Sequence, residues 1–314
     1  MAAPVYSYDK DLYSRAYLNC YQRQSLVRLG EAVPDVTLLF AGALVGTDEI
    51  HRQIVREGRP RYDFESPVLD AEALALLGVT ARQTPAADYA EARPLLLEAV
   101  RESGFALPVI DVFYLPHCVE YRKQHVTHTI MLTGLEDGHW SFVDDNPASV
   151  LCEYRFPERV VADAFDNGEL RQVRTFTTAG YDPAEAAAGI AAMFAARLEA
   201  YTDTYAVLKG AADLLGSPWI APGRAITLLG DVFTVYLGSR TCLREYVRRQ
   251  LPDPETDALL GTAVERAAGL RSRLLIGAVT GLVDVSALAA EALTLKETEE
   301  RLLDRLRAEV LQRL

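Results

Sequence analysis

The chain has 314 residues, of which half are apolar, and it carries a formal net charge of −12. A nucleic-acid-binding protein usually presents a basic face, so this charge argues against a nucleic acid as partner. The N-terminus lacks the features of a secretory signal, and no apolar run approaches the ~20 residues that a membrane-spanning helix needs. The four cysteines show neither Cys-x-x-Cys spacing nor the density of a disulfide scaffold. We therefore expect reduced cysteines, a cytoplasmic location and no membrane partner.

The first elements in chain order are mainly helical. Residues 20–30 place Leu26, Val27 and Leu29 on one helical stripe, with Gly30 as the expected C-terminal stop. Residues 36–44 form a short buried segment whose periodicity fits either a strand or a helix.

Two more helices are expected before the first clear strand. Residues 70–78 have Asp70 as a candidate N-cap. Residues 89–104 contain Pro94, which should mark the first turn of that helix or a kink in it.

A strand-rich region follows. Residues 107–116 are rich in β-branched and aromatic side chains and contain a proline near each end. Residues 128–145 have the pattern of a hairpin, with Glu136, Asp137 and Gly138 as its turn. A short helix over 156–168 and a closing strand over 170–178 complete this part.

The pattern changes near residue 180 and becomes helical throughout. Helical periodicity covers residues 182–216, 223–251, 254–281 and 285–314. We expect a mixed α+β domain over residues 1–180 and an all-helical domain over 181–314. The last helix has an apolar side that packs against its own domain or joins two copies in a homodimer; it comprises Leu302, Leu303, Leu306, Val310 and Leu311.

Cys20 stands where the first helix begins, with Asn19 before it. The thiolate is the reactive form of cysteine, and a helix N-terminus favours an anion there. The same free N–H groups can hold a tetrahedral oxyanion. An inert buried cysteine is the competing interpretation.

His128 opens the first strand of the predicted hairpin, and Asp144 and Asp145 end the second. The register of a tight hairpin brings His128 beside one of these two carboxylates. A carboxylate bonded to one imidazole nitrogen leaves the other nitrogen for the thiol. A one-residue shift would exchange Asp144 and Asp145, so both remain candidates. His125 is a weaker base candidate, and His139 should point away from the site because it belongs to the turn.

These features together resemble a known family. The chain order of cysteine on a helix, histidine opening a strand and aspartate after the next strand is similar to that of papain-like enzymes, specifically the bacterial branch that includes the double-glycine leader peptidases. The stretches NCYQRQSLVRLG, PVIDVFYLPHCVEYRKQHVTHTIMLTG and VDDNP resemble the butirosin biosynthesis protein H family. The most telling residues are Asp111, Tyr114, Leu115 and Pro116, followed by the strand that His128 opens.

The resemblance implies a papain-like fold and acyl transfer. An acyl group on an acyl carrier protein thioester would pass to a small-molecule amine through Cys20, with His128 as base and Asp144 as orienter. No resident cofactor is implied, because the phosphopantetheine arrives on the carrier protein. The family often has histidine before the cysteine, where this chain has Asn19. Papain-like proteases carry an oxyanion-hole glutamine before the cysteine. None precedes Cys20, so Asn19 or main-chain N–H groups would have to replace it.

Several alternatives stay open. The same fold could act as a thioester hydrolase or cyclase or as a cysteine peptidase, and a non-catalytic carrier-protein or ligand-binding module is a different class. A metal site from His125, His128 and Asp144 matches no known ligand spacing, so we expect no metal. Arg244, Arg248 and Arg249 form a basic helical patch that is either a solvated face or a docking site for an acidic carrier protein.

Overall fold

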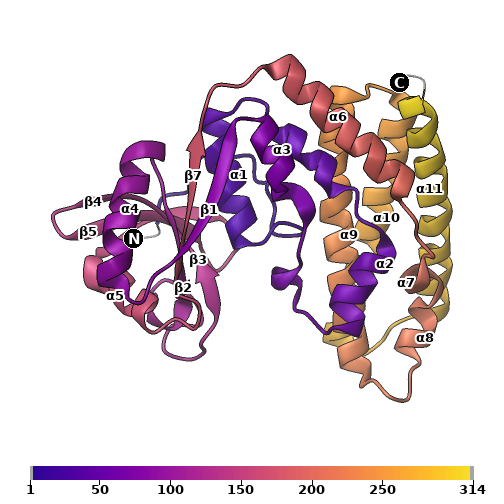
Figure 1. Cartoon of the computed structure of the whole chain (residues 1–314). Helices are drawn as coiled ribbons and strands as arrows, with labels where there is room; N and C mark the ends of the chain where they lie inside the picture. The colour runs from indigo at the N-terminus through magenta and orange to yellow at the C-terminus, as the bar shows by residue number, and fades with distance from the viewer. Residues whose placement is uncertain (1–2, 312–314) are drawn as a thin grey trace. The chain divides into compact units, whose positions relative to one another are not determined.

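The computed structural model describes residues 3–311. The chain divides into two compact units, each built from separate stretches of sequence (Figure 1). The first unit contains the residues up to Arg15, Cys20–Val36 and Ala71–Pro183. The second contains Ala16–Asn19, Thr37–Asp70 and the chain from Ala184 onward. The predicted division at residue 180 stays a prediction.

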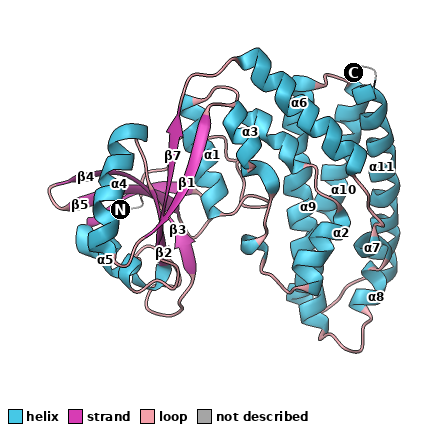
Figure 2. Ribbon diagram, in the orientation of Figure 1, coloured by secondary structure: helices cyan, strands magenta, loops and turns pink. Residues whose placement is uncertain are grey.

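The first unit contains both helices and strands (Figure 2). The strands form two sheets in which every pairing is antiparallel. A four-stranded sheet has the order β1 (Val79–Pro85), β7 (Gln172–Thr178), β2 (Leu107–Asp111) and β3 (Thr127–Thr129). A three-stranded sheet has the order β4 (Met131–Glu136), β5 (His139–Asp145) and β6 (Leu151–Pro157). A bridge between Ala106 and Leu132 connects the two.

Four helices accompany these sheets: α1 (Cys20–Ala32), α3 (Ala71–Leu76), α4 (Tyr89–Ser103) and α5 (Glu158–Asp166). Helices α4 and α5 bury apolar side chains against the strands, in a core that includes Leu96, Phe165, Ile110 and Trp140. Helix α1 lies on the opposite side of the four-stranded sheet from α4 (Figure 1). Ring stacking of Tyr21 on Phe176 supports this packing, at a centroid distance of 6.1 Å.

The hairpin predicted over residues 128–145 is confirmed for residues 131–145, but His128 does not open its first strand, because it lies in β3, which pairs with β2 in the other sheet. Strands β4 and β5 are joined by Asp137 and Gly138, with φ values of 50° and 69°. Two successive residues in the left-handed region are typical of a type I′ turn, which Asp-Gly favours. A register shift between Leu132 and Gly134 interrupts the pairing.

Some boundaries differ from the predictions. Gly30 does not end α1, which continues to Ala32 and stops before Pro34; the residue before a proline avoids the α conformation. The strand predicted over 107–116 ends at Asp111 because the Asp111 side chain accepts a hydrogen bond from Phe113 N and begins a 3₁₀ turn, Val112–Tyr114. Glycine does end α4, where Gly104 has φ 80°.

The second unit is helical in the part that the structure describes. Residues 36–44, left open between strand and helix, form mostly 3₁₀ helix (Val36–Ala43). Other 3₁₀ turns are Arg61–Asp63 and Pro67–Leu69, and a π-helical turn spans His51–Arg56. The α-helices are α2 (Thr47–Ile50), α6 (Pro183–Ala200), α7 (Ala206–Lys209), α8 (Ala211–Leu215), α9 (Pro222–Gln250), α10 (Pro254–Thr280) and α11 (Val285–Leu311).

The long helices enclose a buried ion pair. Arg240 on α9 and Glu299 on α11 are fully buried, and Arg240 Nε lies 3.0 Å from Glu299 Oε1. The Arg240 Nη atoms also donate to the Val45 carbonyl at 3.1 Å. The pair therefore connects α11 and residues 37–70 with α9 inside this unit.

The surface predictions can be compared with these helices. Arg244 and Arg248 both bind Asp257, with Nε–Oδ1 distances of 2.6 and 2.7 Å, and Arg249 binds Glu245. The basic patch is thus largely neutralised by its own unit, which favours the solvated-face interpretation.

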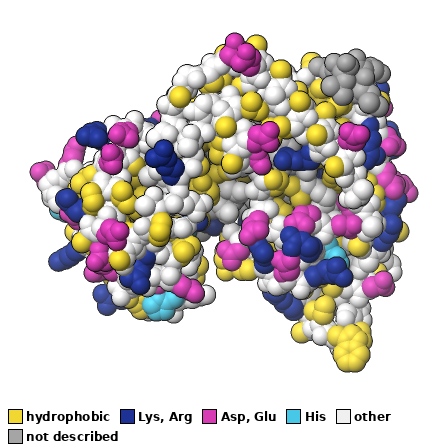
Figure 3. All heavy atoms as spheres, viewed as in Figure 1, with side chains coloured by type: hydrophobic (Ala, Val, Ile, Leu, Met, Phe, Trp, Pro, Cys, Tyr) yellow, Lys and Arg dark blue, Asp and Glu magenta, His cyan; other side chains and the backbone are white. Residues whose placement is uncertain are grey.

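The apolar side of the last helix is partly accounted for. Leu302, Leu303 and Leu306 are buried within the chain, as expected for packing against their own domain, while the Leu311 side chain lies outside the described residues. On the face drawn in Figure 3, acidic and basic side chains are interspersed. Within residues 3–311, no helix combines the length and apolar character that crossing a bilayer requires.

Candidate active site

Cys20 is the first residue of α1 and is partly exposed. Its side chain is hydrogen-bonded to His128, and the Thr129 main-chain N–H donates to its sulfur. Burial would raise the pKa of the Cys20 thiol. The charge and hydrogen bond of His128, together with the charge of Arg15, outweigh burial and lower the pKa. This is the setting that a nucleophilic thiolate needs.

His128 lies in the short edge strand β3, opposite Ile110 of β2. Its Nε2 atom is 2.7 Å from Asp144 Oδ1, and only 11 % of its side chain is exposed. Burial alone would lower the pKa of His128, but Asp144 and Cys20 raise it well above the ordinary value. Because Nε2 is occupied by Asp144, Nδ1 is the ring nitrogen left for the thiol. A lowered cysteine pKa beside a raised histidine pKa describes a thiolate–imidazolium pair.

Asp144 is buried in β5 and accepts hydrogen bonds on both carboxylate oxygens. His128 Nε2 and Gln24 Nε2 contact Oδ1 at 2.7 and 3.2 Å, and His117 Nε2 contacts Oδ2 at 2.8 Å. Burial would raise the pKa of Asp144, but the two histidines lower it below its usual range. The carboxylate is therefore ionised and fixed in orientation.

Asp145 has a different role from Asp144. It accepts from Arg15 at 2.7 Å and from Arg23 at 2.6 Å. Successive strand residues point to opposite faces, so only one of the two carboxylates can reach His128, and in the structure it is Asp144. Asp145 instead holds Arg15, whose charge contributes to the low pKa of Cys20.

Two neighbours of Asp144 were not predicted from the sequence. Gln24 follows Cys20 by one helical turn, and it also donates to the Thr129 carbonyl at 3.0 Å. The four-residue spacing from Cys20 could have indicated it. His117 comes from the loop after β2, and its ring lies 4.0 Å from that of Tyr154, centroid to centroid. Only the tertiary fold brings this loop to β5.

Cys118 is the other partly exposed cysteine of the first unit, and its setting differs from that of Cys20. Its sulfur is 3.6 Å from His117 Nε2, the same nitrogen that binds Asp144. One nitrogen cannot both be oriented by the carboxylate and accept the thiol proton. Burial, Asp144 and Glu120 raise the pKa of Cys118, so this thiol stays protonated.

The donor atoms of His117, Cys118 and Asp144 lie within 4.8 Å of one another, the one such group found among the described residues. Nitrogen, sulfur and carboxylate ligands suit zinc. An ion here would replace the hydrogen bond between His117 and Asp144. The expectation of a site without metal stays a prediction.

The remaining histidine candidates lie elsewhere. His125 binds Asp111 with a distance of 2.5 Å and stacks on Phe113, and 65 % of its side chain is exposed. It contacts neither His128 nor Asp144, so the three residues considered from the sequence as metal ligands, His125, His128 and Asp144, do not form one cluster. His139, at the start of β5, contacts the Asp137 carbonyl, as expected for a residue beside the turn.

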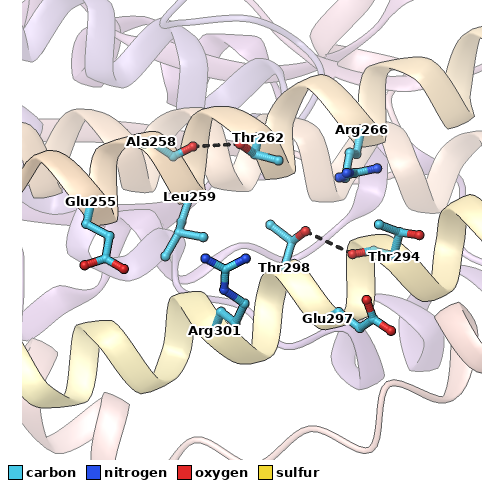
Figure 4. Close-up of a pocket in the computed structure, with 9 residues that line it drawn as sticks. All are labelled: Glu255, Ala258, Leu259, Thr262, Arg266, Thr294, Glu297, Thr298 and Arg301. Carbon is cyan, nitrogen blue, oxygen red and sulfur yellow. Dashed lines mark hydrogen bonds between the residues drawn. The ribbon is translucent and has the colours of Figure 1, made fainter.

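Two hollows are lined by residues other than Cys20, His128 and Asp144. One of about 340 Å³ lies between α10 and α11, where Leu259, Arg301 and Thr298 face the opening (Figure 4). Another of about 200 Å³ is lined by Arg28, Ala32 and Phe176, near the C-terminal end of α1. Neither contains a candidate nucleophile.

The comparison with known proteins adds one relative. No protein-family model matches the chain. A curated protein of Niallia circulans is 23% identical over 129 residues, which are 40% of this chain and 41% of the relative. It is named ribostamycin:4-(gamma-L-glutamylamino)-(S)-2-hydroxybutanoyl-[BtrI acyl-carrier protein] 4-(gamma-L-glutamylamino)-(S)-2-hydroxybutanoate transferase. This chain is a distant relative of that transferase.

The match therefore spans about two fifths of the curated relative's length. Independently of this relation, the first unit holds a partly exposed thiol, an imidazole and a buried carboxylate in contact, in chain order. Such an arrangement can perform nucleophilic acyl chemistry.

Proposed function

We propose that this protein is a papain-like cysteine acyltransferase. It takes an acyl group from an acyl carrier protein thioester and delivers it to an amine through an acyl-Cys20 intermediate, in natural-product biosynthesis. The observation that carries the proposal is the contact between Cys20 and His128, with Asp144 behind the imidazole. The distant relative supports it, because its name describes transfer from an acyl carrier protein.

The papain-like assignment rests on how the three side chains are presented. The cysteine opens a helix that packs beside an antiparallel sheet, and the histidine and aspartate come from strands of the first unit, β3 and β5. The helix N-terminus adds its positive potential to that of His128.

In the loading step, the Cys20 thiolate attacks the thioester carbonyl and forms a tetrahedral oxyanion. The intermediate collapses by breaking the bond to the phosphopantetheine sulfur, which takes the proton held by His128. One thioester replaces another, so the step requires no nucleotide. The phosphopantetheine belongs to the carrier protein and is not a cofactor of this chain.

In the transfer step, a neutral amine attacks the acyl-Cys20 carbonyl. His128, now neutral, accepts the proton that the amine loses. The second tetrahedral intermediate releases the Cys20 thiolate and leaves an amide, with Asp144 stabilising the imidazolium. Asp144 thereby acts through His128 in both steps.

The direct test is mass spectrometry of the protein after incubation with acyl-loaded carrier protein. We expect a mass increase equal to the acyl group, mapped to the peptide that contains Cys20. Cys20→Ala should abolish it. Cys118→Ser alters the other partly exposed thiol and should retain it, because the Cys118 thiol stays protonated.

The fate of the acyl group separates the alternatives. Loading that persists until an amine is added supports a transferase. Rapid release of free acid or a cyclic product indicates a hydrolase or cyclase. Absence of both loading and iodoacetamide labelling near neutral pH would contradict catalysis and favour a binding module.

A further inference from the structure

Arg174 is a half-buried cation on β7, on the side of the sheet that faces α1. Its Nη1 atom lies 3.3 Å from Thr129 Oγ1, and its guanidinium carbon lies 4.3 Å from the centre of the Tyr21 ring. The Gln172 side-chain amide satisfies its hydrogen bonds when its oxygen faces Arg174. In this orientation the oxygen accepts from Arg174 Nε and Nη2 at 3.2 and 3.0 Å. Every acceptor in these contacts is neutral.

No carboxylate within residues 3–311 forms an ion pair with Arg174. The contrast with its neighbours is clear, because Arg15 and Arg23 share Asp145. Burial lowers the pKa of Arg174, and the ionisable groups that oppose this are Tyr21 and Cys20. Partly desolvated charges normally have an opposite charge beside them, and no carboxylate of the described residues supplies one to this guanidinium.

A single residue, Thr129, contacts both Arg174 and the nucleophile Cys20. The Thr129 main-chain N–H donates to the Cys20 sulfur, while the Thr129 hydroxyl accepts from Arg174. Tyr21, which contacts the guanidinium, directly follows Cys20. Thr129 and Tyr21 therefore connect this cation with the nucleophile.

We propose that Arg174 binds a carboxylate carried by the acyl group, so that the preferred donors are thioesters of dicarboxylic acids. This rests on the proposed function of Cys20. The acceptor does not fit, because a guanidinium repels an amine in its ammonium form. The phosphate of the carrier arm fits poorly, because it lies at the far end of that arm, on the leaving-group side of the thioester.

The test measures the rate of Cys20 acylation by N-acetylcysteamine thioesters. Succinyl and glutaryl thioesters carry the carboxylate, and butyryl and pentanoyl thioesters replace it with a methyl group. We expect the wild-type chain to prefer the acidic donors. Arg174→Gln should slow the acidic donors by about tenfold to a hundredfold, the usual scale for a charge-assisted hydrogen bond, and leave the neutral donors within about twofold.

Arg82→Gln is the matched control. Arg82 lies on β1 opposite Thr175, so it projects from the other face of the sheet, and it is exposed. Its substitution should leave the preference for acidic donors unchanged. A second arm compares butyryl-pantetheine with butyryl-phosphopantetheine, where Arg174→Gln should have no specific effect on the phosphorylated donor.

The outcomes are distinct. Equal slowing of acidic and neutral donors in Arg174→Gln, or no preference in the wild-type chain, would overturn the carboxylate assignment while the proposed function stands. A loss confined to the phosphorylated donor would also overturn it, and would assign Arg174 to the carrier arm. Failure of every thioester to acylate Cys20 would instead remove the proposed function, and this inference with it.

Discussion

Asp144 is the most connected residue of the candidate site. It accepts from His128, His117 and Gln24, which come from a strand, a loop and a helix. Each donor stabilises the ionised carboxylate, and together they hold it in one orientation. We infer that His117 and Gln24 are positioning residues, since both contact the Asp144 carboxylate and neither is hydrogen-bonded to the His128 ring.

The first prediction at this scale concerns the pH dependence of Cys20. Asp144→Asn removes the carboxylate that keeps the pKa of His128 high, and a neutral His128 no longer lowers the pKa of Cys20. In the wild-type chain, alkylation by iodoacetamide should fall only when the pH drops through the lowered cysteine pKa. In the variant this fall should occur at higher pH, and alkylation at pH 7 should be about tenfold slower.

His125→Gln is the control for this measurement. His125 is exposed and pairs with Asp111, away from Cys20. Its profile should overlay that of the wild-type chain. Identical profiles for Asp144→Asn and wild type would show that the carboxylate does not act on the thiol.

The sequence reached part of this site. Cys20 was found from a helix start, which is a local pattern, and His128 from its place at the beginning of a strand pattern, although that strand is β3 of the other sheet and not part of the hairpin. The sequence could not decide whether Asp144 or Asp145 contacts His128, because this depends on which face of β5 lies toward β3. The contact of His117 with Asp144 could not be predicted, because His117 lies in a loop that is more than twenty residues from Asp144 in sequence.

At the scale of elements, local signals also decided what could be predicted. The Asp-Gly turn and the long helical periodicities gave the hairpin and α9 to α11. Strand β1 was missed because it pairs on one side only, with β7, and most of its side chains are exposed, so it shows no apolar alternation. Strand β6 was missed as well: it is an edge strand of its sheet, and only its last two residues, 156 and 157, fall within a predicted element, the helix over 156–168.

The second prediction concerns the ion pair between α9 and α11. Glu299→Gln leaves Arg240 buried without a carboxylate, so it should lower the free energy of unfolding by about 3–5 kcal/mol. Urea denaturation followed by circular dichroism measures the change. The double variant Arg240→Met with Glu299→Leu should lose less, because it leaves no unpaired charge in the interior.

A surface pair provides the comparison. Arg248 binds Asp257 while half of its side chain is exposed. Arg248→Ala should cost at most about 1 kcal/mol. Equal effects of Glu299→Gln and Arg248→Ala would contradict the importance assigned to the buried pair.

At the scale of the whole molecule, the two units are interleaved along the chain. Residues 37–70 precede most of the first unit in sequence but belong to the second. They are held there by specific contacts, since Thr47 Oγ1 lies 3.0 Å from Asp203 Oδ1 and the Val45 carbonyl accepts from Arg240. Gly238 of α9 lies so close to Tyr17 that a Cβ added at position 238 would be 2.6 Å from the Tyr17 Cβ.

This interleaving predicts the result of cutting the chain near residue 183. A fragment of residues 1–183 keeps Cys20, His128 and Asp144 but removes the helices that bind residues 37–70. Apolar side chains of that segment, including Phe40, Ile50 and Ile54, are fully buried in the intact chain. Some of this apolar surface should become exposed, so the fragment should aggregate.

A second fragment, in which a Gly/Ser linker replaces residues 37–70, should be the more soluble of the two. Size-exclusion chromatography and thermal unfolding compare them, and a monomeric 1–183 fragment with cooperative unfolding would show that residues 37–70 do not depend on the helical unit.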